Sequence, residues 1–181
     1  MTNREYFSVL PAISYRLFYP QVPAIVCAKY RNEIAAMPAN SCISLSNSPA
    51  LVGVAVRSES KTARLLSSSK NFSLSWLTYS KKAEKYVDQL SSKSPPEPNK
   101  LTALGIPYKT VEGVPVITEA IAFLICHKYS VKRYGDHTLF VGRVKSAKSS
   151  RDFSKDNYWR FKEYKPMLYL GSNKKDPFTT L

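Results

Sequence analysis

The chain has few of the residues on which metal and thiol chemistry depend. Its 181 residues include three cysteines and two histidines, without a CxxC pair and without a second metal ligand at motif spacing. Zinc sites need such clusters, so we expect no metal site. Cys27, Cys42 and Cys126 each lie among apolar residues, which is typical of buried, reduced thiols in cytoplasmic proteins.

Long apolar runs are also missing. The longest, residues 117–126, is interrupted by Glu119 and falls far short of the ~20 residues that a membrane span needs. The first residues, MTNREYFSVLPAIS, lack the apolar core of a secretory signal. We therefore expect a cytoplasmic protein with no membrane segment.

Acidic residues are scarce as well. Thirteen Asp and Glu stand against 27 Lys and Arg, which gives a formal net charge of +14. Such an excess indicates an anionic partner: nucleic acid, a membrane surface or a phosphorylated small molecule. At 44% hydrophobic residues the chain has enough apolar material for a core, and we expect one folded domain spanning residues 1–181.

Short apolar runs separated by turn residues predict a fold rich in β-strands. Strands are expected at 22–29, 34–37, 41–46, 50–57, 72–76, within 114–134, and at 138–144 and 167–170. The run 50–57 is apolar on both faces, so we expect it to be central. Helices are expected at 61–69 and from 80 to about 92. The turn Gly135-Asp136-His137 predicts a β-hairpin, and the whole predicts an antiparallel barrel or an α+β sandwich.

The start of the first expected helix is a candidate phosphate site. Arg57, Ser58, Lys61 and Thr62 place cations and hydroxyls beside helix N–H groups that point toward an anion. An ordinary capped helix with solvated lysines has the same sequence features, so both interpretations stay open. Neither GxxxxGK[ST] nor GxGxxG occurs, which leaves a P-loop or Rossmann site without support.

The order of the motifs resembles the flavin reductase-like family of FMN-binding split barrels. The resemblance lies in residues 19–23, 37–42, 45–52, 57–62, 72–75, 135–144 and 166–171. It therefore covers nearly the whole chain. Its most specific part is the Gly-Asp-His turn followed by the run Thr-Leu-Phe-Val-Gly-Arg-Val. Ala50 departs from the family pattern, which has a second proline at this position.

This resemblance implies a mainly β, antiparallel, Greek-key-like split β-barrel with a few short helices. It implies a homodimer that binds FMN, or FAD, near the subunit interface. Backbone groups of the first segment would line the isoalloxazine ring: Met37, Pro38, Ala39, Asn40, Ser41 and Cys42. Arg57, Ser58, Lys61 and Thr62 would hold the flavin phosphate, and His137 would be the catalytic residue beside flavin and nicotinamide.

We accordingly predict an NAD(P)H:flavin oxidoreductase. Hydride would pass from nicotinamide C4 to flavin N5, and the reduced flavin would serve a partner monooxygenase or reduce ferric iron. Two alternatives stay open. One is an FMN electron carrier of the flavoredoxin type, with no nicotinamide site. The other is a nucleic-acid-binding barrel, because residues 128–175 hold 13 Lys and Arg against 4 acidic residues, with aromatics between them.

Several residues have a structural interpretation beside the functional one. His137 follows a turn, where an imidazole commonly hydrogen-bonds the backbone, although histidine is also a tunable donor. Cys42 is either a small buried side chain or a redox thiol beside the ring. Trp159, Tyr164 and Tyr169 are either core residues or ring-stacking residues.

Overall fold

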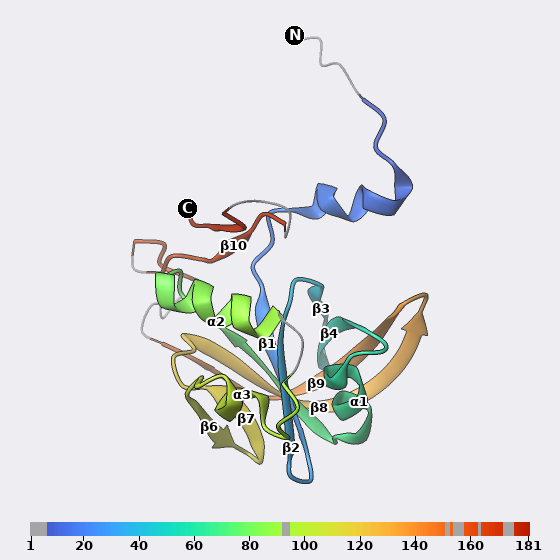
Figure 1. Ribbon diagram of the computed structural model, residues 1–181, viewed down its shortest axis with the longest axis vertical. Coiled ribbons are helices and arrows are strands. Elements are labelled where there is room, and N and C mark those ends of the chain that lie inside the picture. The colour runs from blue at the N-terminus through green and yellow to red at the C-terminus, as the bar shows by residue number, and fades with distance from the viewer. Residues whose placement is uncertain (1–6, 92–94, 151–152, 154–157, 163, 172–175) are drawn as a thin grey trace.

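The fold is built on a seven-stranded antiparallel sheet with the order β2-β1-β5-β8-β9-β4-β3 (Figure 1). A computed structural model describes residues 7–91, 95–150, 153, 158–162, 164–171 and 176–181. The strands of the sheet are β1 (Ala24–Tyr30), β2 (Glu33–Ala39), β3 (Cys42–Asn47), β4 (Ala50–Arg57), β5 (Asn71–Trp76), β8 (Ala122–Tyr134) and β9 (His137–Ser149). The other elements are a 3₁₀ helix η1 (Pro11–Phe18), α1 (Lys61–Ser68), α2 (Lys81–Ser91), α3 (Lys100–Ala103), β6 (Tyr108–Val111), β7 (Val114–Ile117), β10 (Leu168–Tyr169) and β11 (Phe178–Thr179).

The mainly β, antiparallel prediction is confirmed, and the sheet is open rather than a closed barrel. Strands β2 and β3 are its two edges. The hairpin predicted at Gly135-Asp136 is also confirmed, since it joins β8 to β9 with Tyr134 paired to His137. No helix of the described residues is long and apolar enough to span a membrane.

The expected central position of residues 50–57 is wrong. This strand, β4, lies between β9 and the edge strand β3. Val54 and Val56 are buried in the core, whereas Leu51 and Ala55 on the opposite face are only half-buried. Two apolar faces therefore do not identify a strand at the middle of the sheet, because an apolar outer face also occurs near an edge.

Strand β2 is longer than the expected 34–37 and includes Pro38. A proline lacks the N–H that a neighbouring strand would use, and it is therefore tolerated on an edge strand. Pro38 pairs with Ile25 of β1, and no other strand of the seven-stranded sheet lies beside β2. The chain then turns at Asn40 and Ser41 into β3.

Short elements between the predicted ones were missed. Helix α3 has only four residues, too few to show helical periodicity. Its N-cap is Asn99, whose Oδ1 accepts hydrogen bonds from the N–H groups of Leu101 and Thr102. Strand β6 pairs with β7 through a turn in which Glu112 and Gly113 have positive φ angles of 49° and 79°, a conformation that glycine adopts readily.

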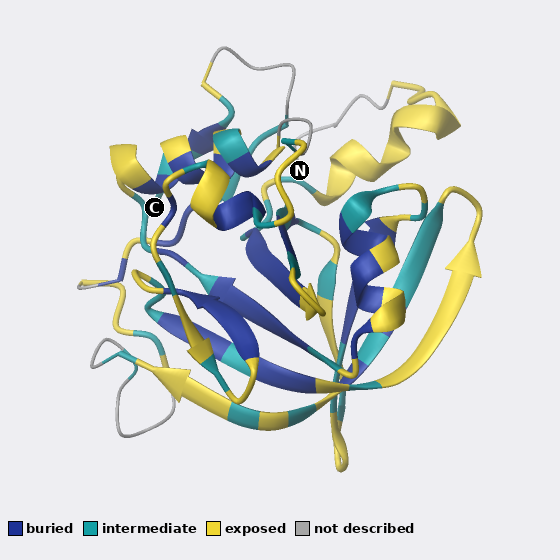
Figure 2. Cartoon of the chain, turned by 60° about the horizontal axis from the view of Figure 1, so that its bottom comes forward, coloured by how far each residue is buried: buried dark blue, intermediate teal, exposed yellow. Residues whose placement is uncertain are grey.

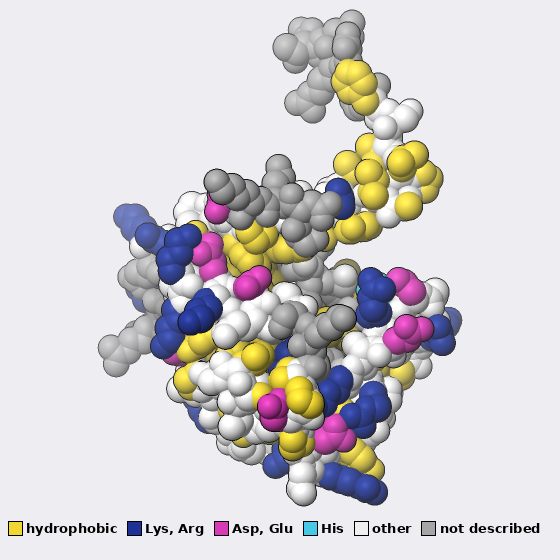
Figure 3. Space-filling view, in the orientation of Figure 1, with side chains coloured by type: hydrophobic (Ala, Val, Ile, Leu, Met, Phe, Trp, Pro, Cys, Tyr) yellow, Lys and Arg dark blue, Asp and Glu magenta, His cyan; other side chains and the backbone are white. Residues whose placement is uncertain are grey.

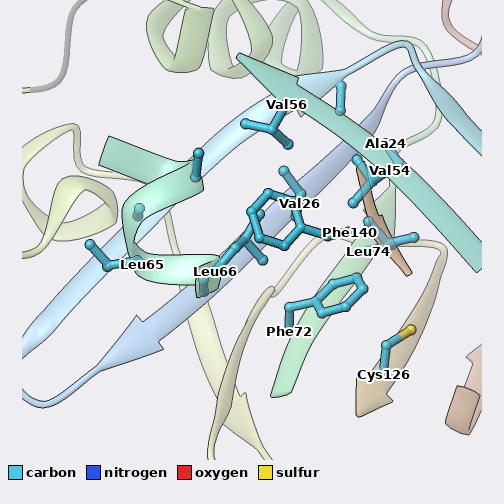
Figure 4. Packing of buried hydrophobic residues seen from close by; sticks show 14 residues of the cluster. Ala24, Val26, Val54, Val56, Leu65, Leu66, Phe72, Leu74, Cys126 and Phe140 are labelled. Carbon is cyan, nitrogen blue, oxygen red and sulfur yellow. The ribbon is translucent and has the colours of Figure 1, made fainter. Parts of the chain in front are cut away.

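Two hydrophobic clusters pack on opposite faces of β1. Successive side chains of a strand point to opposite faces: Val26 packs with Phe72, Phe140 and Leu66 of α1 (Figure 4), whereas Ile25 joins the cluster under α2. The buried face of α2 consists of Ala83, Tyr86, Val87 and Leu90, at helical spacing (Figure 2). Helices α1 and α2 thus cover different faces near the edge strand β2.

Both ends of α1 are satisfied by side chains. At its start, Ser60 Oγ accepts a hydrogen bond from the N–H of Ala63 at 3.0 Å. At its end, Lys128 Nζ donates to the carbonyl oxygens of Leu66, at 3.0 Å, and of Ser67. A cation is favourable at a helix C-terminus because the last carbonyls carry partial negative charge. The Ser60 contact fixes the first turn of α1, and the Lys128 contacts hold its C-terminal end.

Candidate functional site

A cavity of about 730 Å³ lies between edge strand β2, the start of α1, the end of α2 and the C-terminal strands. Pockets for small ligands commonly measure roughly 300–1,000 Å³. The lining residues are Pro23, Met37, Pro38, Asn40, Arg57, Ser60, Lys61, Thr62, Val87, Leu90, Ser91, Lys100, Tyr169 and Phe178. They come from segments far apart in the sequence, so the cavity is a product of the tertiary fold.

The cavity brings together both segments that were predicted to bind flavin. The lining includes the ring-side residues Met37, Pro38 and Asn40. It also includes the phosphate-side residues Arg57, Lys61 and Thr62. The β3–β4 hairpin separates the two groups in the sequence, and the packing of α1 against β1 and β2 brings them together.

The remaining predicted residues are not part of the lining. Ala39 is buried in β2, and its carbonyl oxygen accepts a hydrogen bond from Cys42 Sγ at 3.6 Å. Ser41 is exposed at the turn into β3. The Oγ of Ser58 lies 2.9 Å from Oγ1 of Thr138, so this hydroxyl ties the loop before α1 to β9.

One side of the cavity is cationic. Arg57 ends β4, and Lys61 begins α1 beside its N-cap Ser60. Lys61 Nζ donates to the backbone carbonyl of Glu97 at 2.9 Å, which holds the ammonium group near the cavity. Lys100 is a third cation in the lining, and the described lining residues include no carboxylate. This combination of basic side chains and a helix start favours a bound phosphate.

The other side of the cavity suits a ring. Met37, Pro38, Val87, Tyr169 and Phe178 give it an apolar wall. Asn40 Oδ1 is buried and has no hydrogen-bond partner in the described part of the chain, which is unfavourable unless a ligand or a water supplies a donor. The N3–H of an isoalloxazine ring or a ribityl hydroxyl is such a donor. The residues present therefore fit a flavin nucleotide.

His137 lies at the edge of this region and is not among the lining residues. It is the first residue of β9 and pairs with Arg57 of β4. Its Nδ1 lies 2.7 Å from Asp136 Oδ1, and this hydrogen bond holds the pKa of the Asp136 carboxyl below its usual value. The Asp136 carbonyl accepts from the N–H of Ser58. The turn histidine is therefore tied to the loop that begins the phosphate side.

The cysteines show no sign of redox activity. Burial raises the pKa of Cys27, Cys42 and Cys126 to about 12, so each is a protonated thiol at neutral pH and a poor nucleophile. All three are free thiols. Within the described part of the chain, no cluster of His, Cys, Asp and Glu is suited to a metal ion.

Sequence reasoning missed the cavity residues that come from α2, α3 and the C-terminal strands. Lys100 is 3% exposed and lines the cavity, but nothing in the sequence distinguishes it from a solvated lysine. Tyr169 lies in the lining, a position that its interpretation as a ring-stacking residue allows.

Trp159 and Tyr164 instead line a second groove of about 720 Å³, together with Trp76, Phe123 and Phe161. The described lining of that groove has a single cation, Lys148.

The basic C-terminal segment lies partly outside the described residues, at 151–152, 154–157, 163 and 172–175. Among its described cations, Lys128 caps α1, and Lys145 lies 3.7 Å from Glu112. Figure 3 shows Lys and Arg side chains in several groups on one face of the molecule, with Asp and Glu among them. This distribution gives no continuous basic stripe on that face.

Comparisons with known proteins agree with this geometry. An uncharacterized protein from Aeropyrum pernix is 28% identical over 162 residues; the match covers 88% of this chain but only 61% of that protein. An FMN-binding protein from Thermus thermophilus, crystallised with 1-cyclohex-2-enone, is 27% identical, with a TM-score of 0.81 over 98% of this chain and 95% of that one. An NADH:FAD oxidoreductase from Streptomyces globisporus is also 27% identical, with a TM-score of 0.74 over 91% of this chain and 92% of that one.

The family model of the flavin reductase like domain matches residues 15–176. This range contains all the segments on which the resemblance was based. The seven-stranded sheet lies within this range, as do the residues that line the cavity apart from Phe178. The chain is therefore a member of the flavin reductase like domain family.

Proposed function

We propose that the protein binds FMN in the 730 Å³ cavity and reduces it with NADH or NADPH. The observation that carries this proposal is the convergence of Met37, Pro38 and Asn40 with Arg57, Lys61 and Thr62 around one cavity. The similarity to an FMN-binding protein and to an NADH:FAD oxidoreductase supports it. Whether the flavin stays bound or leaves to serve a monooxygenase or ferric iron depends on its affinity.

The residues of the chain would bind and orient the two nucleotides. Arg57, Lys61 and Thr62 would hold the phosphate, and the apolar wall beside Met37 and Pro38 would shield one part of the ring from water. Asn40 Oδ1 would accept a hydrogen bond from the ligand. When bound, a flavin accepts a hydride at N5 and so couples nicotinamide oxidation to later electron transfer.

His137 remains our candidate catalytic residue at the nicotinamide side. Its Nδ1 is engaged by Asp136 Oδ1 at 2.7 Å. A neutral imidazole that donates its Nδ1–H has Nε2 as an acceptor. We propose that this arrangement orients Nε2 toward the carboxamide of the bound nicotinamide, a group that offers N–H donors.

The activity is tested by mixing the FMN-loaded protein anaerobically with NADH and, separately, with NADPH in a stopped-flow spectrophotometer. We expect the visible flavin band to bleach with at least one of them. Tight FMN binding without bleaching would instead favour the flavoredoxin-type carrier. A protein that binds no FMN but is retained on nucleic acid in a salt-sensitive way would support the third alternative.

We further propose that the protein forms a homodimer through the outer face of β3, β4 and β9. Ile43 and Leu45 of β3 are 59% and 46% exposed. They lie around Gly53 of β4 together with Leu139 of β9. Contiguous exposed apolar surface commonly marks an interface. Helix η1 is a separate exposed apolar element: none of its residues is buried, and Leu17 and Phe18 are more than 70% exposed.

Replacing Ile43 with glutamate is therefore expected to convert the dimer into a monomer. An unpaired carboxylate in an apolar interface costs several kcal/mol, and a two-fold dimer would bury two of them. We expect the dimer dissociation constant to rise by at least about a hundredfold, as measured by size-exclusion chromatography with light scattering. Ser44→Glu is the control, because the neighbouring side chain points to the other face of β3. A monomeric unmodified protein would contradict the proposal.

A further inference from the structure

Lys100 is almost completely buried at the cavity. It is the first residue of α3, is 3% exposed and is one of the residues that line the cavity. Lys100 Nζ donates to the carbonyl oxygen of Leu90, at the C-terminal end of α2, at 2.8 Å. Lysine is rarely buried to this extent unless its charge is compensated.

The fold also brings Lys100 close to a second cation. Burial lowers the pKa of Lys100, and the positive charge of Lys61 lowers it further. Arg57 is the third basic residue around the same cavity. Like charges in a partly dehydrated space repel each other, and an anion between them reverses the sign of the interaction. An ammonium group with a lowered pKa at such a site is stabilised when a dianion binds.

We propose that Lys100 is a further phosphate-binding residue, which acts from α3 while Lys61 and Thr62 act from α1. It would make the cavity selective for phosphorylated flavins over riboflavin. This inference rests on the proposed function and adds a residue to its site. The charge of Lys100 is what the proposal requires, and its hydrogen bond to Leu90 holds that charge at the cavity.

The competing explanation is that Lys100 only caps α2. The chain provides a matched case in Lys128, which caps α1 through the carbonyls of Leu66 and Ser67. Burial lowers the pKa of Lys128 as well. Lys128 does not contribute to the cavity lining. The two lysines therefore share the capping role and differ in their access to the ligand.

The test compares Lys100→Met, Lys100→Gln and Lys128→Met with the unmodified protein. Dissociation constants for FMN and for riboflavin are measured by flavin fluorescence, and melting temperatures of the flavin-free proteins are recorded. We expect both Lys100 variants to lose about tenfold or more in FMN affinity, because a charge-assisted phosphate contact is lost. Riboflavin affinity should stay within about twofold. Lys100→Gln keeps a donor for the Leu90 carbonyl.

Lys128→Met should lower the melting temperature and leave the preference for FMN over riboflavin unchanged. Equal losses for FMN and riboflavin in the Lys100 variants, or an unchanged preference, would overturn the inference. If the unmodified protein binds neither flavin, the proposed function itself fails. If it prefers FMN and the Lys100 variants keep that preference, only the inference about Lys100 fails.

A measurement on the unmodified protein covers the case in which neither Lys100 variant folds. FMN binding is followed by calorimetry at alkaline pH in two buffers with different protonation enthalpies. An anion beside Lys100 restores its proton, so FMN should bind with net proton uptake and riboflavin without it. The absence of uptake with FMN would overturn the inference.

Discussion

Replacing Lys61 with glutamate is expected to weaken FMN binding by at least about a hundredfold and to leave riboflavin binding nearly unchanged. The substitution removes a charge-assisted contact worth about 1.5–3 kcal/mol and adds repulsion against the phosphate dianion. Each 1.4 kcal/mol corresponds to about a tenfold change in affinity. Fluorescence titration with both flavins gives the two dissociation constants.

The control for this substitution is Lys70→Glu. Lys70 is an exposed residue just after α1, and it makes no contribution to the cavity lining. It changes the net charge of the protein by the same amount as Lys61→Glu. Equal effects of the two substitutions would mean that general electrostatic attraction, and not a phosphate-binding site at the start of α1, determines the affinity for FMN. A parallel loss of riboflavin binding would point to a damaged fold.

Replacing Gly142 of β9 with alanine is expected to lower the free energy of unfolding by about 2–3 kcal/mol. A Cβ atom at this position would lie 2.6 Å from Phe72 Cζ and 2.7 Å from Cys126 Cβ. Both neighbours are buried in the cluster of Figure 4, where Phe72 is 1% exposed. Overpacking of a dense core commonly costs about 1–3 kcal/mol. Urea denaturation measures the change.

Gly53→Ala on the adjacent strand β4 is the matched control. Its Cβ would lie 3.1 Å from Leu45 Cδ1 and 3.2 Å from Leu139 Cδ1. These atoms end flexible side chains on the outer face, and Leu45 is 46% exposed. We expect a loss below about 1 kcal/mol in the monomer, because the side chains have room to move. Similar losses at both glycines would contradict the assignment of inner and outer faces.

The local features of this fold were readable from the sequence because they depend on neighbouring residues. The helix expected at 61–69 begins at Lys61 as predicted, and the hydroxyl of its N-cap Ser60 accepts the N–H of Ala63. Gly135 and Asp136 predicted the β8–β9 hairpin, and the alternating residues of β5 predicted a strand. Each of these signals, whether a helix start, a turn or an alternation of apolar residues, depends on residues that are only a few positions apart in the sequence.

The features that depend on distant contacts were not readable in the same way. The position of β4 next to the edge strand depends on which strands pair, and its two apolar faces suit either position. Tyr169 reaches the cavity because it bridges to Gln21 near the start of β1, almost 150 residues earlier. Lys100 reaches it because α3 packs on β2. Only the family resemblance joined residues 37–42 with residues 57–62, and the cavity lining includes three residues of the first segment and four of the second.

The most direct test of the central claim is a crystal structure of the protein saturated with FMN. We predict that the phosphate lies within hydrogen-bond distance of Lys61 and Thr62 at the start of α1, with the ring beside Met37 and Pro38. Asn40 Oδ1, which has no hydrogen-bond partner among the described residues, should then accept a hydrogen bond from the ligand. FMN bound in the groove beside Trp76 and Trp159, or with its phosphate away from α1, would contradict the account.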